Sequence, residues 1–514
     1  MEYLVSGAQM KEYDSGTIEK TGIPSLVLME RAAYATAEEI QKRFRKEKNM
    51  LVIAGCGNNG GDGFAVGRIL QEYGYEVDYV LIGSREKCSA ETEKQIQILE
   101  NMGMTIGQTL PETPYDVIVD ALFGIGLSRE VTGNYLEAIR YMNEAKSYVV
   151  SADIPSGIHA DTGAVMGEAV KADLTVTYGY RKLGLVFYPG ADYAGELICR
   201  KIGIFWQKSM TKPAAITYDK TDLAGIPARR NDGNKGSFGK VLVIAGNYRM
   251  YGACQFAALG AYRSGAGLVR IVTAQENREL LMQTIPEAIV DTYERQTPDT
   301  ELEELLKEAM NWADCVLIGP GIGQEKQAVS IMKYVWENCS LPLVVDADGL
   351  NILSEHETWL MGDDGEGRFR GAAKNAPFVC FTPHMGEFSR LTKKSIKCCK
   401  EEIIVNAKEY AKRCHVIVAA KDARTVVADP EGSIYINTSG DNGMATGGSG
   451  DVLTGILAGL IAQGMQGMEA VCMAVYLHGL AGNAASQKKT VYSVMAGDLL
   501  EELPALFAEG GMDK

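Results

Sequence analysis

The sequence predicts an α/β protein made of two three-layer domains, each with a mostly parallel sheet between two layers of helices. Short apolar strands alternate with helical segments to about residue 180, and a second alternating series begins near residue 240. Crossover connections of this kind cover both faces of a parallel sheet with helices. Residues 205–238 between the series are rich in Pro, Gly, Lys and Asp, as domain boundaries often are. We therefore expect domains at 1–212 and 220–514.

The first domain is expected to open with two helices and then to alternate. Ser6 and Gln9 match a capping box, and Pro24 suits the first turn of a second helix. LVIAG is a short apolar strand, and a helix over 64–73 is closed by Gly74. The remaining strands are expected at EVDYVLIG, YDVIVDALFG, SYVVSADIPSG and ADLTVTYG, and the remaining helices at ETEKQIQILENMG and 135–144.

The second domain repeats the alternation with its own apolar runs. Strands are expected at KVLVIAG, LVRIVT, CVLIGPGIG, PLVVDADGL, FVCFTPH and VIVAAK, and a helix at GACQFAALGAYRSGAG. TVVADPEGSIYIN reads as a hairpin that turns at Pro430 and Gly432. Two long helices of small residues, from about 450 and about 468, complete the domain.

Net charge, apolar stretches and cysteine spacing limit the kinds of partner and the cellular compartments that we expect for this protein. The formal net charge of −15 opposes binding to nucleic acid or to an anionic membrane through a broad electrostatic field. No basic and apolar leader precedes a cleavage site, so we expect a cytoplasmic protein. The longest apolar stretch, 452–465, is too short to span a bilayer. Eleven scattered cysteines lack the spacing of a zinc site and are expected to be reduced, structural thiols.

Polar residues follow three strands of the first domain, where parallel sheets bind ligands. The stretch GCGNNGGDG, 55–63, is a glycine-rich turn whose amides could hold a phosphate. Asp120 and Asp153 each end an apolar run, where a carboxylate is costly unless something uses it. Asn59, Asp120 and Ser156 offer oxygens for a monovalent cation, and Asp153 is the better candidate to act on substrate. Simple turn formation and helix capping are the alternative interpretations.

These stretches together resemble the NAD(P)H-hydrate epimerase domain, through GNNGGDG, D-x-x-F-G-x-G at 120–126 and DIPSG at 153–157. The resemblance covers about residues 1–210 and implies a Rossmann-like domain that interconverts the R and S forms of hydrated NADH and NADPH. It implies K⁺ bound by Asn59, Asp120 and Ser156. Asp153 is the candidate catalytic residue, with proton transfer and assisted ring opening both open. The residues expected to contact the hydrate are Asn58, Asn59, Gly60, Gly61, Asp62, Gly124, Ile125, Gly126, Leu127, Ser128, Arg129, Glu130 and Asp153.

The strongest stretch of the second domain is NGMATGGSGDVLTG, residues 442–455. Gly447, Gly448, Ser449 and Gly450 place bare amides just before a helix, which favours an anion hole. Asp451 follows them, where it could take a proton from a hydroxyl that attacks phosphorus. An acidic residue in a first helical turn without catalytic function is the alternative.

This pattern resembles the ribokinase-like fold, and the motifs around it narrow the resemblance to the ADP-dependent NAD(P)H-hydrate dehydratases. GNYRMYGA, RSGAGLV, GPGIG, DADGLN and TPHMGEFSRL occur in family order. The resemblance implies ADP as co-substrate and Mg²⁺ at the dehydratase site. It implies that Ala253, Gly321, His384 and Asp451 contact the hydrate, and that Lys421, Asp422, Ala423, Arg424, Thr425, Gly447, Gly448, Ser449 and Gly450 contact the nucleotide. His384 could instead be a structural turn histidine.

The combined resemblance implies a bifunctional repair enzyme whose first domain epimerises the hydrates. The second domain would dehydrate the S hydrate with ADP, giving AMP and phosphate. Its partners would be small molecules, and a homo-oligomer is expected because both domain families commonly self-associate. A ribokinase-like small-alcohol kinase and a non-catalytic nucleotide-binding first domain are the competing interpretations. Asp422 departs from the family's glycine-rich loop and would bring negative charge toward a phosphate, which Arg424 could offset.

Overall fold

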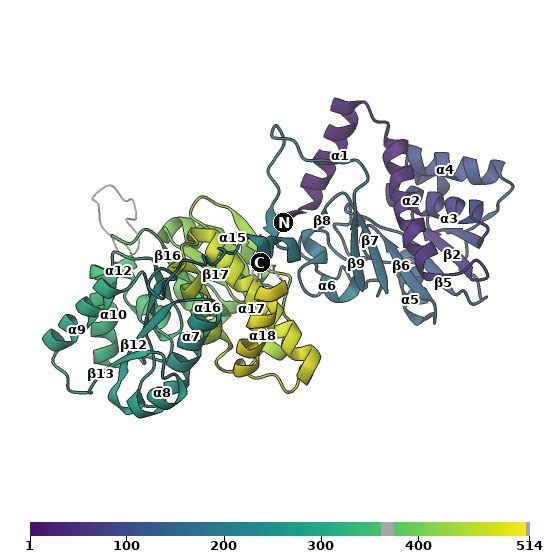
Figure 1. The fold of residues 1–514 in the computed structure, drawn as a ribbon. Helices are drawn as coiled ribbons and strands as arrows, with labels where there is room; N and C mark the ends of the chain where they lie inside the picture. The colour runs from purple at the N-terminus through teal and green to yellow at the C-terminus, as the bar shows by residue number, and fades with distance from the viewer. Residues whose placement is uncertain (361–374, 510–514) are drawn as a thin grey trace. The chain divides into compact units, whose positions relative to one another are not determined.

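The computed structural model, which describes residues 1–360 and 375–509, divides the chain after Ile216 (Figure 1). Glu2–Ile216 form one unit, and the chain from Thr217 onward forms the other together with Met1. The division falls within the interval between the two expected domains. Each unit contains a sheet whose strands come from the alternating series.

The first unit is built on a seven-stranded sheet in the order β4-β3-β2-β5-β6-β7-β9, and all of its strand pairs are parallel. The chain runs outward from β2 in one direction and then from β5 in the other, so the strand order reverses between them. The strands of this sheet are β2 (Asn49–Ala54), β3 (Glu76–Leu81), β4 (Ile106–Gly107), β5 (Val117–Ala121), β6 (Tyr148–Ala152), β7 (Leu174–Tyr178) and β9 (Glu196–Arg200). Outside it, β1 (Glu2–Val5) and β8 (Arg181–Lys182) pair with each other in parallel. The helices are α1 (Gly7–Thr21), α2 (Ser25–Arg43), α3 (Asn58–Glu72), α4 (Ala90–Asn101), α5 (Asn134–Glu144) and α6 (Gly190–Tyr193).

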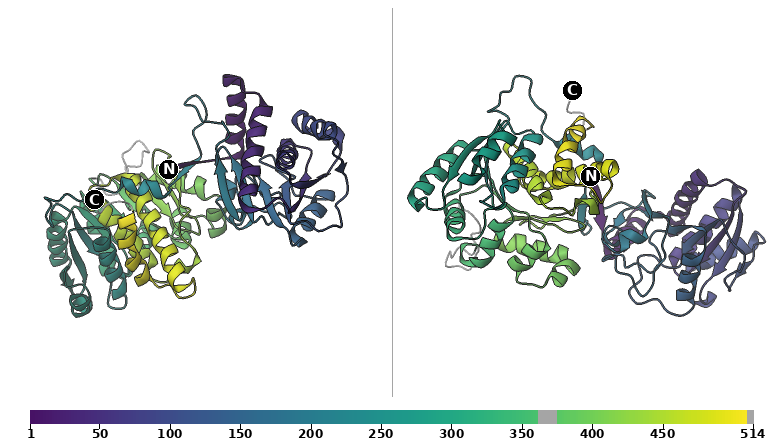
Figure 2. Two further views of the ribbon diagram at one scale, coloured as in Figure 1. Left: turned by 45° about the vertical axis from the view of Figure 1, so that its right-hand side comes forward. Right: turned by 90° about the horizontal axis from the view of Figure 1, so that it is seen from below.

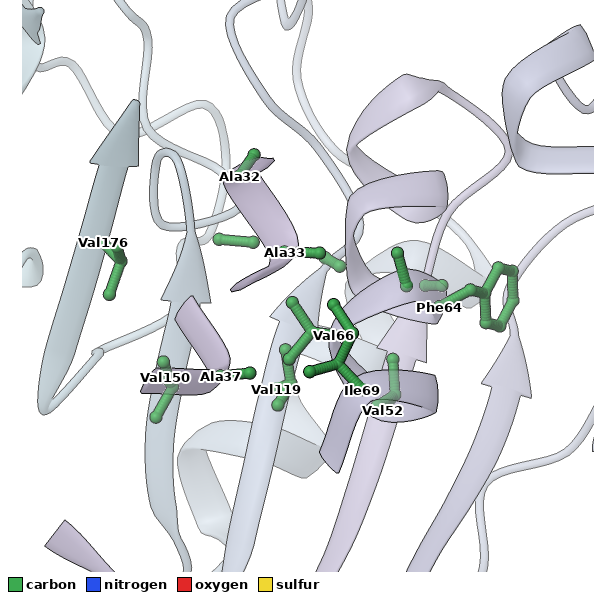
Figure 3. Packing of buried hydrophobic residues seen from close by; sticks show 14 of the residues in the cluster. Ala32, Ala33, Ala37, Val52, Phe64, Val66, Ile69, Val119, Val150 and Val176 are labelled. Atoms are coloured by element: carbon green, nitrogen blue, oxygen red, sulfur yellow. The ribbon is translucent and has the colours of Figure 1, made fainter. Parts of the chain in front are cut away.

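Both faces of this sheet are covered because its strands are apolar on both sides. Alternate β2 residues belong to two separate cores, Val52 packing with α2, α3 and α4, and Ile53 packing with α5. Figure 3 shows alanines of α2 and larger side chains of α3 beside a row of valines from four neighbouring strands. The labelled residues are Ala32, Ala33, Ala37, Phe64, Val66 and Ile69 from the helices and Val52, Val119, Val150 and Val176 from the strands.

Two predicted helix ends, the start of α1 and the end of α3, are confirmed by their hydrogen bonds and backbone conformation. The Ser6 hydroxyl accepts from the Gln9 amide at 3.1 Å, and the Gln9 side chain accepts from the Ser6 amide at 3.0 Å, so the capping box is present. Gly74 follows α3 with φ of 89°, a conformation that favours glycine. The start of α3 was predicted wrongly, because the helix begins at Asn58 and not at Phe64.

The glycine-rich stretch is therefore the first part of α3 and not an open turn. A Cβ at Gly60 would lie 1.8 Å from the carbonyl oxygen of Gly55, and one at Gly63 would lie 2.3 Å from the Cβ of Ala121. These glycines allow the helix to lie directly against the sheet and the preceding loop. Gly57 differs, since nothing lies within 4 Å of the Cβ it lacks.

We expect Gly60→Ala to destabilise the first unit by about 3 kcal/mol, because the new methyl group has no space beside the Gly55 carbonyl. Gly57→Ala is the matched control and should cost less than about 1 kcal/mol at this cap position. The measurement is urea unfolding of the full chain, followed by hydrogen exchange in β2 and α3. Equal unfolding midpoints for the two variants would contradict the packing argument.

The second unit contains a run of strands in the order β13-β12-β11-β14-β15-β16-β17-β18-β19. The order again reverses, here between β11 and β14, and the pairs from β13 to β17 are parallel. The strands of this unit are β11 (Lys240–Ile244), β12 (Leu268–Ala274), β13 (Ile289–Tyr293), β14 (Cys315–Ile318), β15 (Leu343–Val345), β16 (Val379–Phe381), β17 (Ile417–Ala420), β18 (Val426–Ala428) and β19 (Ile434–Ile436). The short strand β10 (Ala215–Thr217) spans the division of the chain after Ile216.

Helices lie on both sides of this second sheet, as the two further views in Figure 2 show. The predicted hairpin is confirmed as the antiparallel pair β18 and β19, with Gly432 at φ of 89° in its turn. Three helices follow it where two were predicted. The helices of this unit are α7 (Tyr251–Arg263), α8 (Arg278–Thr284), α9 (Asp299–Trp312), α10 (Lys326–Asn338), α11 (Asp348–Glu355), α12 (Glu357–Leu360), α13 (Met385–Thr392), α14 (Ile396–Glu401), α15 (Ile403–Cys414), α16 (Ser449–Ala462), α17 (Gly467–Lys489) and α18 (Ala496–Glu509). Within residues 1–360 and 375–509, no helix combines the length and the apolar character that a membrane span requires.

Candidate active sites

The first candidate site lies at the reversal point of the first sheet, the place where open α/β sheets bind ligands. Register aligns the ends of the central strands, with Ala54 beside Ala121 and Asp120 beside Ser151. The loops beyond these ends surround a cavity of about 700 Å³. Its lining includes these residues expected to contact the hydrate: Asn58, Asn59, Asp62, Gly124, Ile125, Gly126, Leu127, Ser128, Arg129 and Asp153.

Three residues expected to contact substrate do not line this cavity. Gly60 and Gly61 are buried and face protein, since a Cβ at Gly61 would lie 2.7 Å from the Cε of Met29. Glu130 is exposed and is not among the residues that line the cavity. Gly60 and Gly61 thus permit close packing, and their polar neighbours Asn58, Asn59 and Asp62 line the cavity.

Asp153 reaches the cavity through an unusual backbone conformation. It follows β6 with φ of 67°, which few residues other than glycine adopt. Its Oδ1 accepts from the Nζ of Lys182 at 2.5 Å, from the Thr177 hydroxyl at 3.1 Å and from the Tyr178 amide at 3.1 Å. Among the described residues no hydrogen bond reaches Oδ2, so one carboxylate oxygen is fixed and the other is available to a ligand.

Lys182 belongs to this site, although its sequence context gave no sign of it. Its side chain is only 1% exposed, and its ammonium also donates to the Thr177 hydroxyl and the Tyr178 carbonyl. It lines the same cavity as Asp153. A buried lysine paired with a carboxylate supplies both a positive charge and a fixed orientation.

A second carboxyl group in the cavity, that of Asp62, has surroundings that disfavour its charged form, whereas Asp153 is paired with a lysine. Burial, followed by the negative charges of Asp153 and Asp14, raises the pKa of Asp62 well above its ordinary value. Burial also raises the pKa of Asp14, with Glu91 and Asp153 adding to the shift. The site therefore joins an Asp153 that is paired with Lys182 to an Asp62 whose raised pKa favours the protonated form, the division expected of a base and an acid.

Asp120 lies behind this cavity and is fully buried. In the part of the chain that the structure describes, it accepts hydrogen bonds from neutral groups alone, namely the hydroxyls of Ser151 and Ser156 and the amides of Ser156 and Leu122. Burial raises its pKa in spite of these bonds. Within the described residues no lysine, arginine or histidine pairs with it, so its charge lacks a counter-ion.

The oxygens near Asp120 suit a monovalent cation. The Ser156 hydroxyl lies 2.6 Å from one Asp120 oxygen and 3.5 Å from the Phe123 carbonyl, to which the Asn59 side chain donates at 3.0 Å. The three predicted K⁺ ligands are thus brought to one place together with a backbone carbonyl. A set of oxygen donors with one carboxylate matches the preference of a hard cation of low charge.

The second candidate site lies at the corresponding edge of the other sheet. Register places Ile244, Ile318 and Val345 side by side, so the loops after β11, β14 and β15 open at one edge. A Cβ at Gly321 would lie 2.9 Å from the Cβ of Ala253, so these two predicted hydrate contacts are neighbours. The loops after β16 and β17 join the same edge through the Lys421 amide, which donates to the Pro383 carbonyl at 2.8 Å.

The glycine-rich loop of this unit ends at the N-terminus of α16, as predicted. Gly448 takes the cap position with φ of 91°, and Asp451 lies in the first turn. A Cβ at Gly450 would lie 3.2 Å from the Nζ of Lys421, so a cation accompanies the helix N-terminus. Gly447 faces open space, with nothing within 4 Å of its missing Cβ. Amides, a cation and open space together make an anion-binding arrangement.

Asp451 has the character of a base that works near neutral pH. Burial, followed by the negative charge of Asp346, raises its pKa to about 7. Lys421 opposes this shift, and Asp348 and Glu387 add to it. A carboxylate whose pKa lies near the working pH is about half ionised there and can both accept and release a proton.

His384 caps a helix in addition to any contact with a ligand. Its Nδ1 accepts from the amides of Gly386 and Glu387, and its Nε2 lies 3.1 Å from a Glu387 oxygen. The bond from the Glu387 amide to Nδ1 and the bond from the His384 amide to a Glu387 oxygen at 2.8 Å form the capping box of α13. The structural role considered for this histidine is therefore present, and its contact with the hydrate stays a prediction.

Asp422 has a partner that the sequence did not suggest. The Nζ of Lys400, on α14, lies 2.9 Å from its carboxylate. The Arg424 guanidinium donates to the Thr438 carbonyl at 3.1 Å. The negative charge of Asp422 is thus compensated by Lys400.

Comparison with known proteins assigns both units to described families. A family model described as NAD(P)H-hydrate dehydratase matches residues 241–505, and a model described as the YjeF-related protein N-terminus matches residues 25–184. A solved ribokinase-like superfamily protein from Enterococcus faecalis is 29% identical with a TM-score of 0.51, covering 59% of this chain and 99% of its own. The ribokinase-like fold expected for the second unit is confirmed.

Relatives that match over their full length join the two families in one chain. The bifunctional NAD(P)H-hydrate repair enzyme of Moorella thermoacetica is 35% identical, over 98% of this chain and 96% of its own. The enzyme of the same description from Escherichia coli is 31% identical, over 96% of this chain and 92% of its own. With both site motifs assembled at the sheet edges, this similarity shows that the chain belongs to the family of bifunctional NAD(P)H-hydrate repair enzymes.

Proposed function

We propose that this chain restores NADH and NADPH from their hydrates through two consecutive activities. The unit Glu2–Ile216 interconverts the R and S hydrates, and the second unit dehydrates the S hydrate with ADP, giving AMP and phosphate. The observation that carries the proposal is the convergence of the polar strand-end motifs at the reversal point of both sheets. Its partners are the hydrates and the nucleotide, and a homo-oligomer and a cytoplasmic location remain predictions.

In the epimerase site, Asp153 is proposed to act on the ring carbon that carries the hydroxyl or on a proton next to it. Its Oδ1 is held by Lys182, which leaves Oδ2 directed to substrate. Asp62, which also lines the cavity, can donate a proton to the hydroxyl while Asp153 accepts one. Proton transfer and assisted ring opening both fit this arrangement.

Potassium is proposed to bind at Asn59, Asp120 and Ser156, with the Phe123 carbonyl as a further donor. When bound, K⁺ would neutralise the buried Asp120 charge and could polarise an oxygen of the hydrate. The protein's own contribution is to fix the adjacent loop, because Ser156 bonds both to Asp120 and to the Phe123 amide. Residues 124–129, which line the cavity, come directly after Phe123 in the chain.

In the dehydratase site, the hydroxyl must be converted into a better leaving group. Asp451 is proposed to remove the hydroxyl proton while the oxygen attacks the terminal phosphorus of ADP, and the bond from phosphorus to AMP breaks. The amides of Gly447 to Gly450 and the Lys421 ammonium stabilise the charge of the transferred phosphoryl group. The lone pair of the ring nitrogen then expels phosphate, and loss of a proton from the neighbouring ring carbon restores the dihydropyridine.

Mg²⁺ is proposed to reach this site on the nucleotide. In the described ranges no group of three or more His, Cys, Asp or Glu side chains could hold a metal ion. Magnesium often keeps its waters and binds through substrate phosphates, which requires no protein cage. When bound, it would neutralise part of the phosphate charge. ADP is the proposed donor on the family resemblance, with ATP the alternative.

The competing small-alcohol kinase would use the same loop to form a stable phosphate ester. Relatives that cover both units carry the repair-enzyme description, so a kinase fused to a non-catalytic module is disfavoured. The hydrate differs from an ordinary alcohol because its ring nitrogen expels the phosphate. An accumulating phosphorylated product would therefore distinguish the two.

The proposal is tested by recovery of NADH absorbance from a mixture of R and S NADH hydrates, with ADP, with ATP and without nucleotide. We expect complete recovery with ADP, since both activities are present in one chain. Recovery that stops at the S fraction would remove the epimerase half of the proposal. Absence of recovery with either nucleotide, together with phosphorylation of a small alcohol, would replace it with the kinase.

A further inference from the structure

An ion pair between a buried carboxylate and a half-buried lysine lies beneath the glycine-rich loop of the second unit. Asp346 follows β15 and is 2% exposed, and its two oxygens lie 3.0 and 3.2 Å from the Nζ of Lys421. Its backbone is held on both sides, because its amide donates to the Ile318 carbonyl and its carbonyl accepts from the Gly349 amide. The carboxylate is therefore a fixed anchor for a long, flexible side chain.

The pair stands where the phosphate is proposed to bind. A Cβ at Gly450 would lie 3.2 Å from the Lys421 Nζ and 3.7 Å from an Asp346 oxygen. The carboxylates of Asp346 and Glu387 together raise the pKa of Lys421 despite its burial, so the ammonium stays charged. Without Asp346, this ammonium would lose the contact that directs it toward α16.

Asp346 also belongs to the charged surroundings of Asp451. Apart from burial, its negative charge is the largest influence that raises the pKa of Asp451. Two neutral groups complete these surroundings, since burial raises the pKa of the Cys254 thiol to about 11 and lowers that of His478 to about 4. The groups that face Asp451 are Asp346 after β15, Lys421 after β17, Asp348 on α11, Glu387 on α13, Cys254 on α7 and, through Ser449, His478 on α17.

We infer that Asp346 is a positioning residue for phosphoryl transfer, which holds the Lys421 ammonium against the first turn of α16 and keeps a negative charge beside Asp451. It acts through these two residues and does not itself contact the reacting atoms. The inference rests on the proposed dehydratase function. It extends that function to a residue that neither the glycine-rich loop nor the nucleotide loop contains.

The test compares Asp346→Asn with the full chain that carries no substitution. Asparagine keeps the size and an oxygen acceptor but removes the charge. We expect the KM for ADP to rise about tenfold, since Lys421 loses its charged partner. We also expect the acid limb of the kcat profile, near pH 7 in the unchanged chain, to move about one unit lower because Asp451 loses a neighbouring negative charge.

Asp348→Asn is the matched control, because Asp348 also faces Asp451 but bonds to the Gly323 amide and the Gln324 side chain. Its KM for ADP should stay near that of the unchanged chain. Loss of activity in Asp346→Asn with no change in KM and no movement of the acid limb would overturn the inference.

A double variant guards against simple misfolding. Lys421→Met alone should raise the KM for ADP, and adding Asp346→Asn should raise it little further if Asp346 acts through Lys421. Fully additive effects would contradict the inference. If the unchanged chain shows no ADP-dependent recovery, the proposed function fails separately, and equilibrium binding of ADP then decides. Weaker binding in Asp346→Asn than in Asp348→Asn would support the positioning role, and equal binding would end it.

Discussion

Asp451→Asn is expected to lower the rate of ADP-dependent dehydration by about 10³-fold, because it removes the base that takes the proton of the attacking hydroxyl. Asparagine fills the same space in the first turn of α16. Binding of ADP should change little, since the amides of that turn and Lys421 remain in place. The measurements are single-turnover recovery of NADH from pure S hydrate and equilibrium binding of ADP.

The pH dependence of the unchanged chain belongs to the same prediction. The base must be ionised to accept a proton, so the dehydration rate should fall as the pH drops through about 7, the pKa to which burial and Asp346 raise Asp451. Below that value the group is protonated and inactive. In the Asn variant this acid limb should be absent from the remaining activity.

Asp498→Asn provides the matched control for an acid in the first turn of a helix. Asp498 lies in the first turn of α18, as Asp451 does in α16, accepts from the Met495 amide and pairs with Lys489. Its replacement should lower stability slightly and leave dehydration close to that of the unchanged chain. If Asp451→Asn resembled this control, the catalytic role would be wrong and Asp451 would be an ordinary helix residue.

Asp153→Asn is expected to reduce the epimerase rate by at least about 100-fold if proton transfer is the mechanism. The amide cannot accept a proton, and it also loses the charge that pairs with the buried Lys182. Recovery from pure S hydrate should be unaffected, because the dehydratase residues lie in the other unit. The measurement is the recovery of NADH from pure R hydrate with the dehydratase step kept in excess.

Asp161→Asn controls for the loss of a carboxylate elsewhere in the same unit. Asp161 accepts from the Gly7 amide at 2.6 Å and does not line the cavity. Its variant should epimerise normally. An unchanged epimerase rate in Asp153→Asn would discard proton transfer by this residue and leave assisted ring opening as the mechanism.

Local patterns of the sequence determined the fold class and most elements of this protein. Alternation of apolar strands with helices is typical of parallel sheets. The capping box at Ser6 and the turn at Gly432 are formed by residues close together in the sequence, so the sequence was enough to predict them. The polar residues after strands were sufficient to predict where both candidate sites lie, because parallel strands end at a common edge. The glycine-rich stretches 55–63 and 442–455 were likewise recognised from the local sequence alone.

Only the tertiary structure decided which residues complete the sites. Lys182 pairs with Asp153 from 29 residues away, and Lys421 pairs with Asp346 from 75 residues away. The sequence gives Lys182 no distinguishing context and predicts Lys421 only as a nucleotide contact. Only the fold places each lysine beside a distant carboxylate. Tertiary packing likewise showed that Gly60 serves the contact between helix and loop, because the nearby Gly55 carbonyl leaves no space for a side chain. The local sequence shows which side chains a segment carries, whereas the fold decides which distant charges and packed surfaces those side chains contact.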